Sequence, residues 1–449
     1  MEVAIDDPKH APAPVSFWFA LRFWFKLGLI SFGGPAGQIA IMHQELVEQK
    51  RWISERRFLH ALNYCMVLPG PEAQQLATYI GWLMHRTWGG IAAGVLFVLP
   101  SLFMLIALSW FYIAFGDMPL IAGLFYGIKP AVAAIVLHAT HRIGSRALKN
   151  GVLWSLAIAS FVAIFALNVP FPLIVLIAGV IGYVGGRWMP QKFDAAGAHK
   201  ERATSYGVAL IDDDTPTPAH ALFRWTGLMH IALVGALLWL LPMGLLIAVC
   251  GWDHTLTQMA WFFTKAALLT FGGAYAVLPY VYQGAVVHYG WLSATQMIDG
   301  LALGETTPGP LIMVVAFVGF VGAYAHAVLG PDHVFAAGAI AAVIVTWFTF
   351  LPSFIFIFAG GPLVETTHGN MHFTAPLTGI TAAVVGVILN LALFFGYHVL
   401  WPHGFAGAFD WIGAAITLAA ALALFRFKIN VIHVIAASAI VGLLISLIR

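Results

Sequence analysis

Two segments of this chain, residues 23–71 and 262–310, are copies of one another at a constant offset of 239 residues, the difference between 271 and 32. The 49 positions align without a gap, and 14 of them are identical. The repeat continues at an offset of 252, which brings Leu99-Pro100-Ser101 onto Leu351-Pro352-Ser353. A long internal duplication of this kind indicates a protein built from two similar halves.

The chain is also strongly apolar. Of its 449 residues, 61% are hydrophobic and 9% are charged, against about 25% charged residues in soluble domains. Six apolar segments precede a polar stretch at 187–224, one unpaired segment follows at 225–250, and six more complete the chain. We predict an all-α integral membrane protein with transport repeats at 1–186 and 258–449, joined through 187–257 by a solvated cytoplasmic linker and a linking helix.

An odd number of linking segments predicts that the second repeat is inverted relative to the first. The charges of the loops agree with this inversion. Loop 45–57 carries four Lys and Arg residues, whereas its partner around 290–293 carries none. Because short loops rich in Lys and Arg stay in the cytoplasm, we expect the N-terminus and the loops 45–57 and 142–149 on the cytoplasmic side.

Gly/Pro breaks interrupt the segments 17–34 and 58–84 and leave apolar pieces of about 11–15 residues. A membrane crossing takes about 20 residues, so we predict that both segments are re-entrant hairpins. Irregular backbone at membrane depth is tolerated only when it is buried in protein or lines a cavity. The breaks should therefore face a central site.

The motif Pro69-Gly70-Pro71 precedes a predicted helix that begins with Glu72 and Gln75, and Pro308-Gly309-Pro310 repeats it. The free N–H groups and the dipole of a helix N-terminus attract anions. We predict that the backbone at Gly70 and Gly309 receives an anion near the membrane midplane. The alternative is that both motifs only kink a transmembrane helix. The Gly-Gly breaks are assigned to the same substrate site; their residues are Gly33, Gly34, Gly272 and Gly273.

Charged residues inside apolar segments are rare and usually mark a transport pathway. Lys26 and Lys265 each stand six residues before a Phe-Gly-Gly motif, where they either complement a divalent anion or extend to the membrane surface. Lys129 is either a site charge or the partner of an acid. Glu72 and Glu305 either pair with a lysine or carry a proton for coupling, and Glu72 has the further alternative of a helix N-terminal charge, which contributes about 0.3–1 kcal/mol.

Several classes of protein are not indicated. There is no Walker A, GxSxG or HExxH sequence, and no clustered basic face for nucleic acid. Cys65 and Cys250 lie in different apolar segments and are expected to be small core residues. The 18 histidines include pairs at helical spacing, but no Cys or carboxylate cluster joins them. We predict no enzyme activity, cofactor, metal site or nucleic-acid partner, and a homodimer is left open.

The motifs together resemble the chromate ion transporter (CHR) family in its long, two-domain form. They are Ser31-Phe32-Gly33-Gly34-Pro35, Trp52-Ile53-Ser54, Leu68-Pro69-Gly70-Pro71-Glu72, Gly81-Trp82 and Phe97-Val98-Leu99-Pro100-Ser101, with Thr270-Phe271-Gly272-Gly273, Trp291-Leu292-Ser293 and Thr307-Pro308-Gly309-Pro310 in the second half. The resemblance implies an inner-membrane secondary transporter that exports chromate from the cytoplasm and confers chromate resistance. One departure is Gly273-Ala274 in place of Gly34-Pro35.

Alternatives to chromate export stay open at this point. Sulfate and other tetrahedral oxyanions resemble chromate in charge and size. A protein of another class, a membrane-embedded chromate-reducing enzyme, would need a flavin, haem or metal site. A channel would pass ions without saturation, and a sensor would carry a soluble signalling domain.

Overall fold

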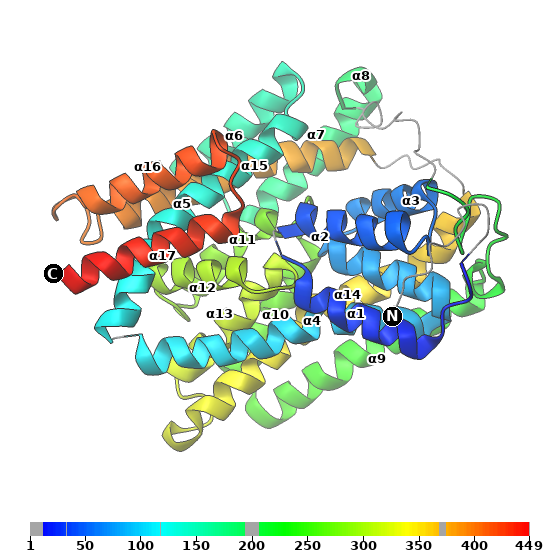
Figure 1. Cartoon of the computed structure of the whole chain (residues 1–449), viewed down its shortest axis with the longest axis horizontal. Coiled ribbons are helices and arrows are strands. Elements are labelled where there is room, and N and C mark those ends of the chain that lie inside the picture. Colours follow the sequence, from blue (N-terminus) through cyan, green and yellow to red (C-terminus); the bar gives the residue numbers. More distant parts are fainter. Residues whose placement is uncertain (1–11, 33, 117, 194–205, 368–373, 449) are drawn as a thin grey trace.

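The computed structural model describes residues 12–32, 34–116, 118–193, 206–367 and 374–448. In this part of the chain the regular structure is helical apart from one isolated β-bridge, and seven helices are long and apolar enough to cross a membrane (Figure 1). This confirms the prediction of an all-α integral membrane protein.

The helices follow the apolar segments of the sequence. The first half contains α1 (Phe17–Ile30), α2 (Gly34–His43), the π-helix η1 (Gln44–Gln49), α3 (Glu55–Val67), α4 (Glu72–Phe115), α5 (Pro119–Ala147), α6 (Gly151–Leu167), α7 (Phe171–Trp188) and α8 (Pro190–Phe193). The linker holds η3 (Ala219–Ala221) and α9 (Trp225–Cys250). The second half contains α10 (Thr255–Leu268), α11 (Ala274–Tyr282), the π-helix η4 (Gln283–His288), α12 (Ala294–Thr306), η5 (Leu311–Met313), α13 (Val314–Ala325), η6 (Pro331–His333), α14 (Val334–Thr367), α15 (Thr374–Leu400), α16 (Trp411–Phe425) and α17 (Val431–Ile448).

The duplication is visible in the helix boundaries. The π-helix η1 and the helix α3 recur as η4 and α12 at the offset of 239 residues. Equivalent serines start the two helices: Ser54 accepts a hydrogen bond from the Arg57 N–H, and Ser293 accepts one from the Gln296 N–H within a capping box. Equal N-caps in the sequence thus give equal helix starts.

The first hairpin of each repeat turns back at its Gly-Gly break. Lys26 of α1 lies 3.6 Å from Glu45 of η1, and the rings of Phe23 and Trp52 lie 4.7 Å apart. Phe262 and Trp291, the equivalent residues of the second repeat, lie 5.6 Å apart. The two arms of each hairpin therefore run antiparallel, and their outer ends lie together.

A second hairpin follows. α3 packs against the first arm of α4, residues 72–84, and the rings of Tyr64 and Tyr79 lie 5.8 Å apart. α4 then reverses at His85 and Arg86, whose backbone angles are not helical, and its second arm, residues 87–115, runs back across the molecule. The segments 17–34 and 58–84 thus both turn back inside the protein, as re-entrant segments do.

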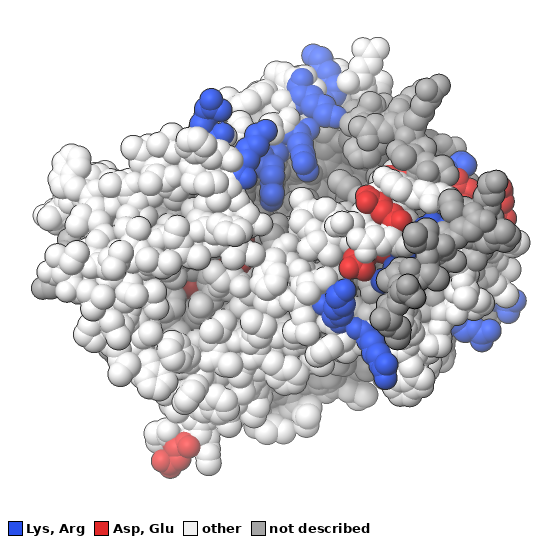
Figure 2. Space-filling view, in the orientation of Figure 1, with Lys and Arg blue, Asp and Glu red and all other residues white. Residues whose placement is uncertain are grey.

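The Lys and Arg residues gather at one end of the bundle, over the upper and right-hand parts of the face drawn in Figure 2. We call this the basic end; it carries the loop 45–57, the turn at 148–150 and the linker 206–224. Among the described residues, the connections at the opposite end contain no Lys or Arg, and they span 168–170, 251–254, 289–293, 326–333 and 401–410. The basic loops 45–57 and 142–149 therefore lie on the same side of the bundle, as predicted.

The linker departs from the prediction of a solvated segment. Within its described part, Ile211 is buried and forms an isolated parallel bridge with Ile53. Its N–H donates to the carbonyl oxygen of Trp52, and its own carbonyl accepts from the N–H of Ser54. Residues 206–224 pack on the basic end, where the backbone of the loop 51–54 forms hydrogen bonds with Leu210 and Ile211. Their polar composition did not reveal this contact.

Candidate functional site

The four Gly/Pro breaks of the two repeats meet at the centre of the molecule. The Gly70 N–H donates to the carbonyl oxygen of Thr270, 2.7 Å away, and the Gly309 N–H donates to that of Ser31, 2.8 Å away. Ser31 and Thr270 hold the same position in the two repeats, and so do Gly70 and Gly309. Each Pro-Gly-Pro break is thus closed by the Gly-Gly break of the other repeat. Gly33 lies outside the described residues.

The Pro-Gly-Pro breaks also pack tightly against the long helices of the opposite repeat. Gly70 and Gly309 have positive φ angles of 127° and 102°, which favour glycine. A Cβ atom on Gly70 would lie 2.3 Å from the Ser353 Oγ, and one on Gly309 would lie 2.7 Å from the Ser101 Cβ. Ser101 and Ser353 are again equivalent, in the two Leu-Pro-Ser motifs. Glycine is therefore required at both breaks by backbone conformation and by space.

These hydrogen bonds correct one prediction. The N–H groups of Gly70 and Gly309 are already donated to carbonyl oxygens, so they do not receive an anion in this conformation. The donors that remain are the N–H groups of the first helical turns, which have no partner within their own helix. Such turns follow the breaks at α2, α4, α11 and η5. The sequence located the breaks, but it did not show that the backbone of one repeat pairs with the break of the other.

Buried amide side chains surround the crossing. Gln75 donates from Nε2 to the carbonyl oxygen of Pro69 at 2.8 Å, and Gln38 donates to the carbonyl oxygen of Gly309. The amide oxygens of Gln38, Gln74 and Gln75 are buried without a hydrogen-bond partner among the described residues, as is the Ser101 hydroxyl. Buried polar atoms without partners are rare in proteins, which suits a site that receives a polar ligand or water.

Sequence reasoning found only part of this polar set. Gln75 was among the predicted site residues, whereas Gln38 and Ser101 were not. The repeat gives no signal for Gln38, because Val277 takes its place in the second half. Ser101 stands in the repeated Leu-Pro-Ser motif, and this recurrence is the signal that could have pointed to it.

The three predicted lysines form their ion pairs and cation–π contacts with residues outside the breaks. Lys26 is 62% exposed and pairs with Glu45 of its own hairpin. Lys265 lies over the ring of Trp261, with Nζ 5.5 Å from the ring centroid. Among the described residues, none of the lysines forms a hydrogen bond or ion pair with a break. Lys129 is the partner of an acid, with its Nζ 3.4 Å from the Asp299 Oδ2.

The two predicted acids differ in their surroundings. Glu305 is buried and accepts a hydrogen bond from the Tyr275 hydroxyl. Glu72 stands at the first position of α4, directly after the Pro-Gly-Pro break, and has no hydrogen-bond or ion-pair partner among the described residues. Neither acid pairs with a lysine in this conformation. A proton-coupling acid and a helix N-terminal charge remain the interpretations of Glu72.

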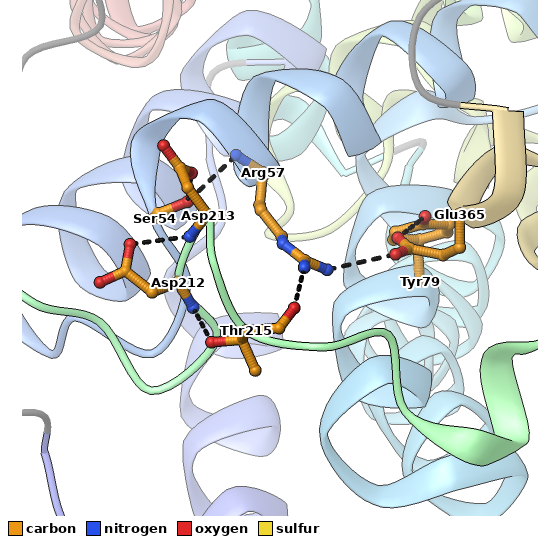
Figure 3. Close-up of polar contacts among 7 residues, drawn as sticks. All are labelled: Ser54, Arg57, Tyr79, Asp212, Asp213, Thr215 and Glu365. Carbon is orange, nitrogen blue, oxygen red and sulfur yellow. Dashed lines mark hydrogen bonds and ion pairs between the residues drawn. The ribbon is translucent and has the colours of Figure 1, made fainter.

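Two further networks tie the repeats together, one toward each end. At the basic end, Glu365 of α14 is buried, pairs with Arg57 of α3 at 3.2 Å, and accepts a hydrogen bond from the Tyr79 hydroxyl (Figure 3). Arg57 also donates to the carbonyl oxygen of Thr215 in the linker, and Ser54 donates to Asp213 at 2.6 Å. The linker thus fastens the same hairpin that Glu365 holds.

Toward the opposite end, the buried carboxylate is Asp299 of α12. Besides Lys129 it receives a hydrogen bond from the Tyr112 hydroxyl of α4 at 2.9 Å. In both networks a long helix of one repeat is tied to the second hairpin of the other. Their residues differ, however: Glu365 is equivalent to Ile113, and Asp299 to His60. The repeat therefore gave no signal for either network.

The described residues contain no group of three or more His, Cys, Asp or Glu side chains that could hold a metal ion. What the centre offers instead is helix N-termini, buried amides and hydroxyl groups. The helix N-termini and the hydroxyl groups suit a small anion held by hydrogen bonds, whereas the free amide oxygens accept hydrogen bonds and suit water.

Two similar halves whose broken helices meet at the centre of a membrane protein are the architecture of transporters built from repeats. Comparison with known proteins identifies the particular family. The family model described as "Chromate transporter" matches residues 18–183 and 257–443, and the chain belongs to this family.

Named relatives agree with this assignment. A chromate transport protein of Pseudomonas aeruginosa is 35% identical over 84% of this chain and 80% of its own length. One of Cupriavidus metallidurans is 28% identical over 83% of this chain and 81% of its own length, and a probable chromate transport protein of Synechococcus elongatus is 26% identical over 88% of both chains. No solved structure matches this chain significantly.

Proposed function

We propose that this protein is a secondary transporter that exports chromate from the cytoplasm across the inner membrane and thereby confers chromate resistance. The observation that carries the proposal is the reciprocal crossing of Gly70 with Thr270 and of Gly309 with Ser31, which gathers four breaks at one central place. Chromate is proposed as the substrate because relatives of this chain are named chromate transport proteins. The basic end faces the cytoplasm, because loops rich in Lys and Arg stay there.

The anion binds at the first turns that follow the breaks. Each helix N-terminus carries a partial charge of about +0.5, so several of them together offset much of the charge of a dianion. Ser101 lies beside these turns, and its hydroxyl group adds a neutral donor. The Nε2 atoms of Gln74 and Gln75 already donate to Thr78 and Pro69, so they donate to an anion only after these bonds are released. Gly34, Gly272 and Gly273 keep side chains away from the same place.

Alternating access then requires that one end of the pathway opens while the other stays closed. Arg57 and Glu365 close the basic end in this conformation, and Lys129 and Asp299 close the opposite end. Both pairs join a long helix to the hairpin of the other repeat. Breaking one pair at a time exposes the centre to one side only, which is the gating that transporters built from repeats use.

The exposed position of Lys26 supports a role in attracting the anion toward the centre rather than in holding it there. Lys265 has no acidic partner in the described part of the chain, and Gly284 stands where Glu45 stands in the first repeat. An interior-negative potential favours exit by about 2.3 kcal/mol per charge per 100 mV, and a dianion gains about twice that. The potential therefore favours export, and coupling to proton or anion exchange is left open.

Everted membrane vesicles test this proposal, because export from the cytoplasm appears there as uptake. Vesicles from cells that produce the protein should accumulate chromate in a saturable way, and the intact cells should contain less chromate than control cells. Sulfate added in excess measures the selectivity for chromate. Uptake equal to that of control vesicles contradicts the proposal, and higher chromate content in the intact cells contradicts the direction.

A further inference from the structure

A long groove lies outside the central site, between α9 and the arms of α4 and α14. It has a volume of about 690 Å³. It runs from Thr87 and Arg224 at the basic end to Leu102 and Leu238 deeper in the bundle. Its walls are apolar along most of this length; they include Ile91, Val98, Ile231, Phe350 and Phe354.

The groove is open toward the surroundings of the protein. The wall residues Val95, Val343 and Trp347 remain exposed. α9 buries only Gly235 and Met243, so it leaves most of its surface free. For a chain that crosses the membrane, an open apolar groove between transmembrane helices is in contact with lipid.

The upper limit of the groove lies at the level of the lipid headgroups. Trp88 and Trp225 follow Thr87 and Arg224 directly and are 74% and 72% exposed. Exposed tryptophans of membrane proteins concentrate at the membrane–water interface. The guanidinium group of Arg224 therefore lies where lipid phosphates lie.

Charge and length both define the occupant. Arg224 is the one Lys, Arg, Asp or Glu side chain that lines the groove in the described part of the chain. From Arg224 to Leu238 the helix rises by about 21 Å, at about 1.5 Å per residue. One leaflet of the hydrocarbon core is about 15 Å thick, half of about 30 Å. The groove thus offers one cation at the headgroup level and an apolar wall as long as an acyl chain.

We propose that this groove binds an anionic phospholipid of the leaflet at the basic end. The phosphate pairs with Arg224, and one acyl chain lies along α9 between α4 and α14. A lipid phosphate at this level supplies the negative charge that Arg224 attracts. The inference does not depend on which ion the protein transports.

Two glycines of α9 provide a matched test. Gly227 lines the groove, Gly244 does not, and a Cβ on either residue has no other atom within 4 Å. Gly227→Phe should fill the groove without a clash, whereas Gly244→Phe adds the same ring to the same helix elsewhere. Arg224→Gln removes the charge, and Arg187→Gln removes an exposed charge from α7 as its control.

The measurement is native mass spectrometry of the purified full chain, equilibrated in detergent with equal amounts of phosphatidylglycerol and phosphatidylcholine. Wild type and Gly244→Phe should retain phosphatidylglycerol about fivefold over phosphatidylcholine, the preference that one basic residue near an anionic surface supplies. Gly227→Phe should lose the bound lipid, and Arg224→Gln should retain lipid without preference.

Equal retention by Gly227→Phe and Gly244→Phe would overturn the proposed groove, and an unchanged preference in Arg224→Gln would overturn the role of the charge. Retention of neither lipid by the wild type would mean that detergent or a protein segment occupies the groove, and this outcome also overturns the proposal. Chromate transport is not part of the readout, so failure here is distinguishable from failure of the proposed function.

Discussion

The backbone N–H of Gly309 and the carbonyl oxygen of Ser31 are joined by a hydrogen bond of 2.8 Å, and Gly70 and Thr270 repeat it at 2.7 Å. Each repeat completes the broken backbone of the other. Because buried backbone groups without partners are costly, these two bonds favour keeping the centre intact while the ends move. We therefore propose that the crossing stays in place while the two repeats rock around it.

Glycine should matter more than proline at the Pro-Gly-Pro breaks. Gly70→Ala and Gly309→Ala should each destabilise the protein by about 1–3 kcal/mol through backbone strain alone, and the contacts with Ser353 and Ser101 should add to this cost. Pro69→Ala and Pro308→Ala should cost less. Thermal unfolding of the purified variants measures the order.

Gly290→Ala is the control, because Gly290 also has a positive φ, of 64°, but no atom lies within 4 Å of an added Cβ. Its cost reports the strain without the contact. If the proline variants proved less stable than the glycine variants, the motifs would be helix kinks and not points of close contact.

The predicted inversion of the second repeat implies opposite labelling of equivalent residues. Arg56 and Thr295 hold the same position in the two repeats, and both are exposed. Single cysteines at these positions, in a chain with Cys65→Ala and Cys250→Ala, should react with an impermeant maleimide from opposite sides of the membrane. Arg56 should react only in everted vesicles. Reaction of both positions from one side would exclude the inverted arrangement.

Breaking the pair Arg57–Glu365 should open the basic end. Loss of one partner leaves the other charge buried without compensation, which costs about 3–5 kcal/mol. Cys65 is a native reporter, because it is buried three residues before the break at 68–71. In a Cys250→Ala background, Glu365→Gln should raise the rate of Cys65 labelling in everted vesicles at least about tenfold, the effect of about 1.4 kcal/mol.

Asp332→Asn is the control for this experiment, since Asp332 is an exposed acid in a connection at the opposite end. It should leave the labelling of Cys65 unchanged. Unchanged labelling in Glu365→Gln would show that the ion pair does not hold the basic end closed.

Glu72 should make transport depend on pH. A carboxylate beside the anion repels it, so the anion binds when Glu72 is protonated, and chromate transport should fall as the pH rises. Glu72→Gln should remove this dependence. Glu305→Gln, which keeps its partner Tyr275, should retain it. If Glu72 is only a helix N-terminal charge, the Glu72→Gln variant should lose about 0.3–1 kcal/mol of stability and keep the wild-type pH profile.

The sequence predicted the features that local patterns encode. The repeat, the Gly/Pro breaks and the apolar segments indicated where the helices lie, and pieces too short to cross a membrane indicated that the chain turns back at the segments 17–34 and 58–84. The packing of the linker on the loop around Ile53 escaped prediction, because backbone pairing leaves no signature in composition.

The polar networks escaped for another reason. Arg57 and Glu365 stand 308 residues apart, and nothing in either local sequence points to the other. Asp299 stands in place of His60, so comparison of the repeats also conceals it. Contacts between the halves follow from their arrangement in space, which a single sequence does not report.

Reconstitution of the purified protein in liposomes tests the central claim most directly. With chromate inside and a potential imposed by a potassium gradient and valinomycin, chromate should leave protein-containing liposomes faster when the interior is negative, and the rate should saturate with chromate concentration. Sulfate in the same assay measures selectivity. Chromate efflux equal to that of protein-free liposomes at every imposed potential would contradict the account.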